Sequence, residues 1–163
     1  MPQPSYFPLP ITVEDITAQW LTAALRQRAQ VTVSGFEILD VVNTTTTKVR
    51  IRLQLDDAGR RAGIPERIIV KGGFQPHGRD LDHMHLREVR GYRDVYPEIP
   101  LPSPACYFAD FDAERRQGIV IMEDLVERGV AFCHATRPQT HEQVARLLSF
   151  WPRSMPGLGT APN

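Results

Sequence analysis

Residues 67–96 read RIIVKGGFQPHGRDLDHMHLREVRGYRDVY, and the fold prediction starts from this segment. It opens with an apolar, largely β-branched run that ends in Lys71 and is followed by Gly72 and Gly73. Runs of this kind favour a strand inside a sheet, so we expect Lys71 at the end of a buried strand. A charge in that position is costly unless a partner compensates it.

The second half of the segment predicts a helix over residues 79–96. One stripe at three- and four-residue spacing is mostly apolar, and Glu88 is its only carboxylate. The stripe consists of Leu81, Met84, His85, Glu88, Val89, Tyr92, Val95 and Tyr96. Because a carboxylate among apolar neighbours needs a partner, we expect Glu88 to form an ion pair with Lys71. The alternative is a purely structural ion pair that holds no ligand.

Alternation of apolar and polar residues predicts further strands on both sides of this segment. The five expected strands are residues 31–42, 48–55, 67–71, 105–111 and 118–122, with loops at 43–47, 56–65 and 112–117. Because the helix falls between the third and fourth strands, this order predicts an α+β domain with a five-stranded antiparallel sheet.

An additional helix is expected near the N-terminus. Residues 1–11 contain several prolines and read as an extended lead-in. Thr12 is followed by Glu14 and Asp15, which is a helix-start signal of the capping-box type. The helix that follows has one apolar face and is expected to end near Gln30.

The C-terminal region predicts less structure. A short helix is expected from Thr140, and the Pro- and Gly-rich residues 152–163 are expected to be unstructured. The predicted divisions are therefore a lobe over residues 12–125, a connecting region over 126–151 and a tail.

Composition excludes several classes of protein. The 163 residues are 42% hydrophobic and 23% charged, which is typical of a globular chain. Lys+Arg and Asp+Glu each number 19, and this zero net charge argues against nucleic acid as the main partner. No apolar run approaches the ~20 residues of a membrane helix, so we expect a cytoplasmic protein without a membrane partner. Cys106 and Cys133 are expected to be reduced thiols.

A cluster of acids and histidines at the start of the predicted helix suggests a metal site. It comprises His77, Asp80, Asp82, His83 and His85. His83 and His85 are two residues apart, so on a helix their side chains diverge by about 200° and cannot chelate one ion together. Solvated histidines are therefore favoured, and a metal-dependent hydrolase built on residues 80–85 is the alternative.

Four segments carry a resemblance to known proteins. They are residues 46–52 (TTKVRIR), 69–74 (IVKGGF), 87–93 (REVRGYR) and 119–125 (IVIMEDL). Together they resemble the superfamily of aminoglycoside phosphotransferases, choline kinases and ecdysteroid kinase-like proteins, and within it the bacterial enzymes that phosphorylate small hydroxylated molecules. The resemblance covers roughly residues 12–151 and implies the N-terminal lobe of a kinase fold.

The resemblance implies ATP and Mg²⁺ as cofactors and a small hydroxylated molecule as acceptor. In such an arrangement Lys71 contacts the α- and β-phosphates, and Glu88 holds Lys71. Backbone groups of Glu123 and Leu125 bind the edge of the adenine. An acidic loop after a strand is the alternative interpretation of that last segment.

The same resemblance implies that a hairpin covers the phosphates. The expected residues are Asn43, Thr44, Thr45, Thr46 and Thr47. This loop departs from a glycine-rich pattern, because no glycine lies between Phe36 and Ala58. β-Branched residues resist the positive-φ turns that glycine allows.

The catalytic loop of this superfamily, of the His-Gly-Asp type, has no counterpart after Trp151, so no catalytic residue or Mg²⁺ ligand is assigned. We therefore expect the ATP-binding lobe of a small-molecule kinase, truncated and inactive by itself. An exposed lobe surface is expected to promote self-association. The alternative is a non-catalytic nucleotide-binding or regulatory module.

Overall fold

The computed structural model describes residues 7–99, 103–130, 132 and 136–154. Its centre is a five-stranded sheet in the order β1-β2-β3-β5-β4, in which every neighbouring pair is antiparallel. The strands are β1 (Val33–Asn43), β2 (Thr47–Leu55), β3 (Arg67–Gly72), β4 (Cys106–Asp112) and β5 (Gln117–Glu123). The predicted α+β class and antiparallel sheet are therefore confirmed.

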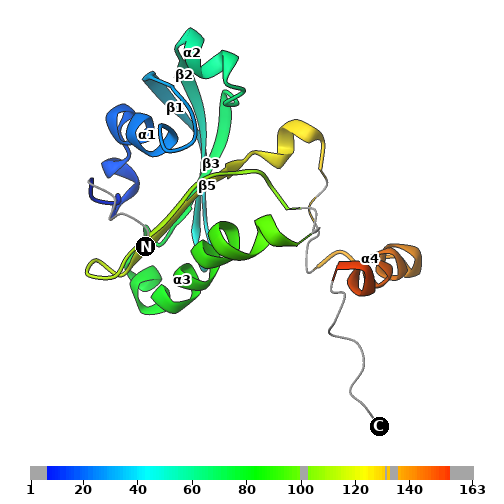
Figure 1. The fold of residues 1–163 in the computed structure, drawn as a ribbon. Helices are drawn as coiled ribbons and strands as arrows, with labels where there is room; N and C mark the ends of the chain where they lie inside the picture. Colours follow the sequence, from blue (N-terminus) through cyan, green and yellow to red (C-terminus); the bar gives the residue numbers. More distant parts are fainter. Residues whose placement is uncertain (1–6, 100–102, 131, 133–135, 155–163) are drawn as a thin grey trace.

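Helices α1 (Ala18–Leu25) and α3 (Asp82–Arg90) lie on opposite sides of the sheet (Figure 1). Because side chains alternate along a strand, each strand contributes to both sides. On the α1 side the apolar residues form the main core, and the contribution of β2 is Val49, Ile51, Leu53 and Leu55. On the α3 side β2 carries Lys48, Arg50, Arg52 and Gln54.

The N-terminal helix begins later than predicted. Thr12 and Asp15 form a capping box, but it starts only a single 3-10 turn, η1 (Val13–Asp15). The backbone then extends through Ile16 and Thr17, and Thr17 caps α1 by accepting a hydrogen bond from the Trp20 N–H at 3.1 Å. The sequence therefore contains two consecutive helix starts, and only the second is followed by a buried apolar face.

The helix predicted over residues 79–96 is present as several consecutive turns. They are the 3-10 turn η2 (Pro76–Leu81), α3, the wider π-helical turn η3 (Gly91–Val95) and η4 (Tyr96–Glu98). The predicted apolar stripe is wrong at Met84, Val95 and Tyr96, which are 43%, 47% and 36% exposed. Two causes act together. Helix α3 packs mainly on β4 and β5, and the π turn rotates its residues and those after it away from the α-helical stripe.

Two further predictions need correction. The expected loop 56–65 contains a short helix, α2 (Asp57–Arg61), capped by Asp56, which accepts from the Gly59 N–H at 2.8 Å. The C-terminal helix α4 (His141–Ser154) continues through Pro152, so residues 152–154 are helical and not part of an unstructured tail. A proline lacks one N–H donor but keeps a helix-compatible φ. The rest of the predicted tail, 155–163, lies outside the described residues.

The lead-in is anchored where the structure describes it. Leu9 is buried in the main core, and the Pro10 carbonyl accepts a hydrogen bond from Gln117 Nε2 at 2.7 Å. Helix α4 instead extends away from the sheet (Figure 1), and its apolar residues Val144, Leu147 and Leu148 are exposed. No helix within the described ranges is both long and apolar enough to cross a bilayer.

Candidate nucleotide-binding site

The ion pair predicted between Lys71 and Glu88 is present. Lys71 is the penultimate residue of β3 and points to the α3 side, and Glu88 lies in the last turns of α3. The Nζ and Oε1 atoms are 2.5 Å apart, and the side chains are 20% and 23% exposed. An ammonium group carries three N–H donors, so this pair leaves Lys71 with donor capacity on a side that water can reach.

A close-packed turn positions Lys71. The Gly73 N–H donates to Gln117 Oε1 at 3.1 Å, and the same Gln117 amide reaches the lead-in through Nε2. A Cβ atom on Gly73 would lie 2.7 Å from His85 Nε2, so only glycine allows the turn to approach α3 this closely. The close packing of the turn against His85 therefore explains why residue 73 is glycine.

His85 supports the same turn from the helix. Its Nε2 lies 3.1 Å from the Gly78 carbonyl oxygen, and because a carbonyl only accepts, this nitrogen carries a proton. Burial lowers the pKa of His85 below the usual 6.5, and the Gly78 hydrogen bond opposes this only in part. The imidazole is therefore neutral at physiological pH and acts as a structural donor.

The hairpin tip formed by residues 43–47 lies next to this turn, because Thr47 is the cross-strand partner of Gly72. Its polar groups are largely used internally. Thr47 is buried and donates from Oγ1 to Asn43 Oδ1 at 2.9 Å. The Thr44 N–H and hydroxyl both donate to the Thr46 carbonyl, at 3.2 and 3.0 Å.

The tip is also tied to the loop after β3. Gln75 Nε2 donates to Asn43 Oδ1 at 3.4 Å, and His77 Nε2 lies 3.1 Å from the Thr44 carbonyl oxygen. Thr44 and Thr45 are exposed, and Thr46 is half-buried. The structure therefore brings the predicted phosphate-covering segment beside Lys71, with Thr47 buried and the other four residues accessible.

The predicted adenine-binding segment starts at Glu123, the last residue of β5, and its Asp124 side chain contacts Arg50 on the α3 side. The Glu123 N–H donates to the Ala105 carbonyl at 2.9 Å. Leu125 begins a 3-10 turn, η5 (Leu125–Arg128), and its carbonyl accepts from the N–H groups of Gly129 and Val130. Within the described residues the Leu125 N–H makes no hydrogen bond, so it is the backbone donor that this segment can offer to a ligand.

Sequence reasoning missed the ion pair that holds this segment. Asp124 is buried, and its Oδ2 accepts from Arg50 Nε at 3.0 Å and Nη2 at 2.9 Å, while Oδ1 caps η5 at the Val126 N–H. Arg50 is on β2 opposite Ile69 of β3, and Ile69 is opposite Met122 of β5. The guanidinium thus spans the sheet toward residues 123–125. The alternating charges of β2 were the available signal, but the partner lies 74 residues away.

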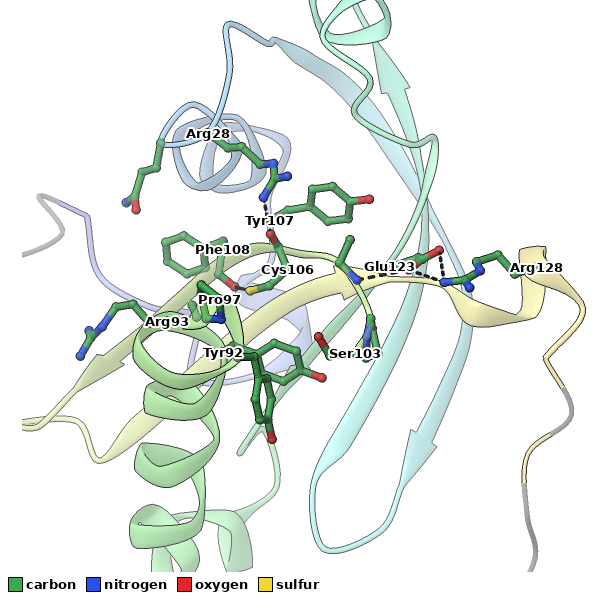
Figure 2. A pocket seen from close by; sticks show the side chains of 15 residues that line it. Arg28, Tyr92, Arg93, Pro97, Ser103, Cys106, Tyr107, Phe108, Glu123 and Arg128 are labelled. Atoms are coloured by element: carbon green, nitrogen blue, oxygen red, sulfur yellow. Dashed lines mark hydrogen bonds and ion pairs between the residues drawn. The ribbon is translucent and has the colours of Figure 1, made fainter. Parts of the chain in front are cut away.

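In the described structure, cavities border the 123–125 segment but not the Lys71–Glu88 pair. One of about 680 Å³ wraps around edge strand β4 near the ends of α1 and η3 (Figure 2). There Arg28 Nη1 donates to the Cys106 carbonyl at 2.7 Å and the guanidinium lies 5.3 Å from the Tyr107 ring centroid. Burial raises the pKa of Tyr92 to about 12 and also raises the pKa of the Cys106 thiol. Both groups are therefore neutral at physiological pH.

Only Glu123 belongs both to the 680 Å³ cavity and to the predicted site residues. Its carboxylate accepts from the Ala105 N–H at 3.2 Å and from Arg128 at 3.3 Å, as Figure 2 shows. Lys71 and Glu88 line neither this cavity nor those of about 590 and 370 Å³. The lysine end of the candidate site therefore lies outside these cavities, whereas Glu123 and Asp124 line the one of about 370 Å³.

The residues of the alternative metal site diverge. His77 is directed to the hairpin tip, His85 to Gly78, and Asp82 Oδ2 accepts from Arg116 Nε at 2.7 Å. This hydrogen bond lowers the pKa of Asp82. In the part of the chain that the structure describes, no three His, Cys, Asp or Glu side chains are placed to hold a metal ion. Cys133 lies outside that part, and Cys106 is a free thiol.

The candidate site therefore groups Lys71, Glu88 and the hairpin tip at one end of the α3 side of the sheet, and residues 123–125 at the other. Ile69 and Met122 lie between them, with Arg50 alongside. Comparison with known proteins adds no relative, because no family model, curated protein or solved structure matches this chain.

Proposed function

We propose that this chain binds a nucleoside triphosphate as the N-terminal lobe of a small-molecule kinase. The observation that carries the proposal is the ion pair between a lysine on the third strand and a glutamate on the helix that follows. In protein kinases this pairing aims the lysine at the nucleotide phosphates, and it must be formed for phosphoryl transfer. The proposal assigns the same task to Lys71 and Glu88.

The base would lie between the two ends of the site. Ile69 and Met122 offer apolar contact there, and the Leu125 N–H offers a donor to a ring nitrogen. Arg50 is 25% exposed and lies beside this position, so its guanidinium plane can pack on the face of an aromatic base. The phosphates would then extend toward Lys71 and the hairpin tip.

Magnesium and the acceptor would depend on groups outside this cluster. Phosphoryl transfer needs Mg²⁺ to neutralise charge and a carboxylate to orient the attacking hydroxyl. Glu88 is already paired with Lys71 and Asp124 with Arg50. The proposal therefore gives this lobe the role of holding ATP, and a small hydroxylated acceptor is assigned to the full kinase arrangement.

A second candidate is a regulatory module that binds nucleotide without transferring phosphate. The tethered hairpin tip favours it, because Gln75 and His77 restrain a loop that would have to adjust during turnover. Both candidates require nucleotide binding. Transfer of ³²P from ATP to a panel of small alcohols separates them.

Calorimetric titration of the 163-residue chain with MgATP tests the shared step. Lys71→Gln should weaken ATP binding by about tenfold or more, because it removes a charge-assisted phosphate contact. Arg52→Gln is the matched control, since Arg52 lies on the same side of the sheet but pairs with Glu37. Absence of binding at millimolar ATP, or equal losses in the two variants, would contradict the proposal.

A further inference from the structure

The only two lysines in the chain face each other across neighbouring strands. The sequence uses arginine at every other cationic position, and its lysines are Lys48 and Lys71. The register of β2 against β3 makes them direct cross-strand partners. Partners in an antiparallel pair point to the same side, with Cβ atoms roughly 4.5–5.5 Å apart. Both ammonium groups therefore belong to the α3 side of the sheet.

Charge compensation on this side is incomplete at one position. The other cations of β2 and β3 each have a carboxylate partner, in the pairs Arg50–Asp124, Arg52–Glu37, Arg67–Glu127 and Lys71–Glu88. For Lys48, the described residues provide no ion pair. Like charges placed directly opposite each other destabilise a sheet. Within the described structure, the two neighbouring lysines therefore have only the carboxylate of Glu88 as a partner, and the second positive charge is left uncompensated.

The Lys71–Glu88 pair by itself is poorly suited to bind a polyphosphate. Its two charges cancel, and Glu88 repels an approaching phosphate. Lys48 restores a net positive charge at this point of the sheet. The hairpin tip has no charged side chain, and its Thr44 N–H is already bonded to the Thr46 carbonyl.

We propose that Lys48 is a second phosphate-binding residue, which acts with Lys71 to hold a nucleoside di- or triphosphate. This inference rests on the proposed nucleotide-binding function and adds to it the residue that supplies the net charge. Two ammonium groups on adjacent strands can contact successive phosphates. The site therefore selects nucleotides by the number of their phosphates.

A ladder of ligands tests this assignment. Adenosine, AMP, ADP and ATP are titrated into the unmodified chain and into Lys48→Gln, Lys48→Arg, Lys71→Gln and Arg52→Gln. Lys48→Gln should weaken ATP binding by about tenfold and AMP binding by less than about twofold, since a charge-assisted contact is lost only with the longer phosphate chain. Lys48→Arg should recover most of the affinity, and Arg52→Gln should match the unmodified chain.

The presence of only two lysines allows a second readout without any variant. Reductive ¹³C-methylation labels Lys48, Lys71 and the N-terminal amine, and the NMR signals of both lysines should shift on addition of ATP. If Lys48→Gln binds ATP like the unmodified chain while Lys71→Gln does not, Lys48 is not a phosphate contact and the proposed function stands. If the unmodified chain binds none of the ligands, both proposals are overturned.

Discussion

The two sides of the sheet are built from the same strands but use opposite chemistry. On the α1 side, Val49, Ile51, Ile68 and Val70 are fully buried in one continuous apolar core. On the α3 side, a small cluster of Val89, Val120 and Met122 lies beside a row of partly exposed ion pairs. Burial of apolar surface is the dominant favourable term in folding. The α1 side therefore stabilises the fold, and the charges of the α3 side can serve binding.

The largest loss of stability is expected for a substitution in the apolar core on the α1 side. Ile51→Ala on the α1 side should lower the free energy of unfolding by about 2–5 kcal/mol, because it opens a cavity among fully buried neighbours. Ile69→Ala, on the half-buried α3 side, should cost about 1 kcal/mol. Urea denaturation of both variants measures the difference. Equal losses would contradict the unequal roles of the two sides.

The next largest loss of stability is expected when the buried Asp124 loses its partner Arg50. Arg50→Gln should lower the free energy of unfolding by about 3 kcal/mol, because Asp124 would remain buried without its charged partner. Arg52→Gln is the matched control on the same strand. Its pair with Glu37 is 45% and 60% exposed and is expected to contribute less than about 1 kcal/mol. A loss in Arg50→Gln no greater than in the control would show that Asp124 is solvated.

A smaller effect is expected for the ion pair of the candidate site. Glu88→Gln should lower the free energy of unfolding by about 1 kcal/mol, since both side chains keep contact with water and the pair is only partly shielded. In the same variant the two lysines lose their nearest negative charge, so added salt should recover part of the loss. Thermal unfolding at low and high ionic strength measures this. A loss that does not depend on salt would indicate packing instead of charge.

The smallest expected effect is a pH dependence on the α3 side. Burial lowers the pKa of His85 below 6.5, so the unfolded chain binds this proton more readily than the folded chain. Stability from the neutral imidazole is then fully present above the unfolded pKa and is lost as the pH falls through it. The melting temperature should decrease from pH 7.5 to pH 5.5.

Variant His85→Gln should show a shallower decrease over the same range, with His83→Gln on the exposed face of α3 as the control for removing a histidine. The carboxylates with lowered pKa values, such as Asp15 and Asp56, titrate at more acidic pH and do not interfere. An identical slope in His85→Gln and the unmodified chain would assign the pH dependence to other groups.

Local sequence patterns were sufficient for the contact between Lys71 and Glu88. One charge at the end of an apolar strand and one on an apolar helical stripe each needed a partner, and only 17 residues separate them. The Arg50–Asp124 pair was not predictable in this way, because it depends on the order of the strands. The pairing of the two lysines depends on strand register, which the alternation pattern of each strand leaves undefined.

Helix boundaries, too, could not be predicted from local sequence patterns alone. The signals at Thr12 and Thr17 are both valid caps, and the choice between them depends on which following residues reach the core. The π turn at Gly91–Val95 has no periodic signature in the sequence, yet it decides that Val95 is exposed. The positions of charged partners and of helix irregularities are thus properties of the assembled sheet.

Gln117 has a consequence for how this protein can be handled in the laboratory. Its side-chain amide joins the N-terminal lead-in to the glycine turn behind Lys71, since one end donates to Pro10 and the other accepts from Gly73. A truncation that starts after Pro10 would leave a buried amide donor unsatisfied and loosen the brace behind the lysine. Expression boundaries and cleavable tags should therefore be chosen so that Leu9 and Pro10 stay in place.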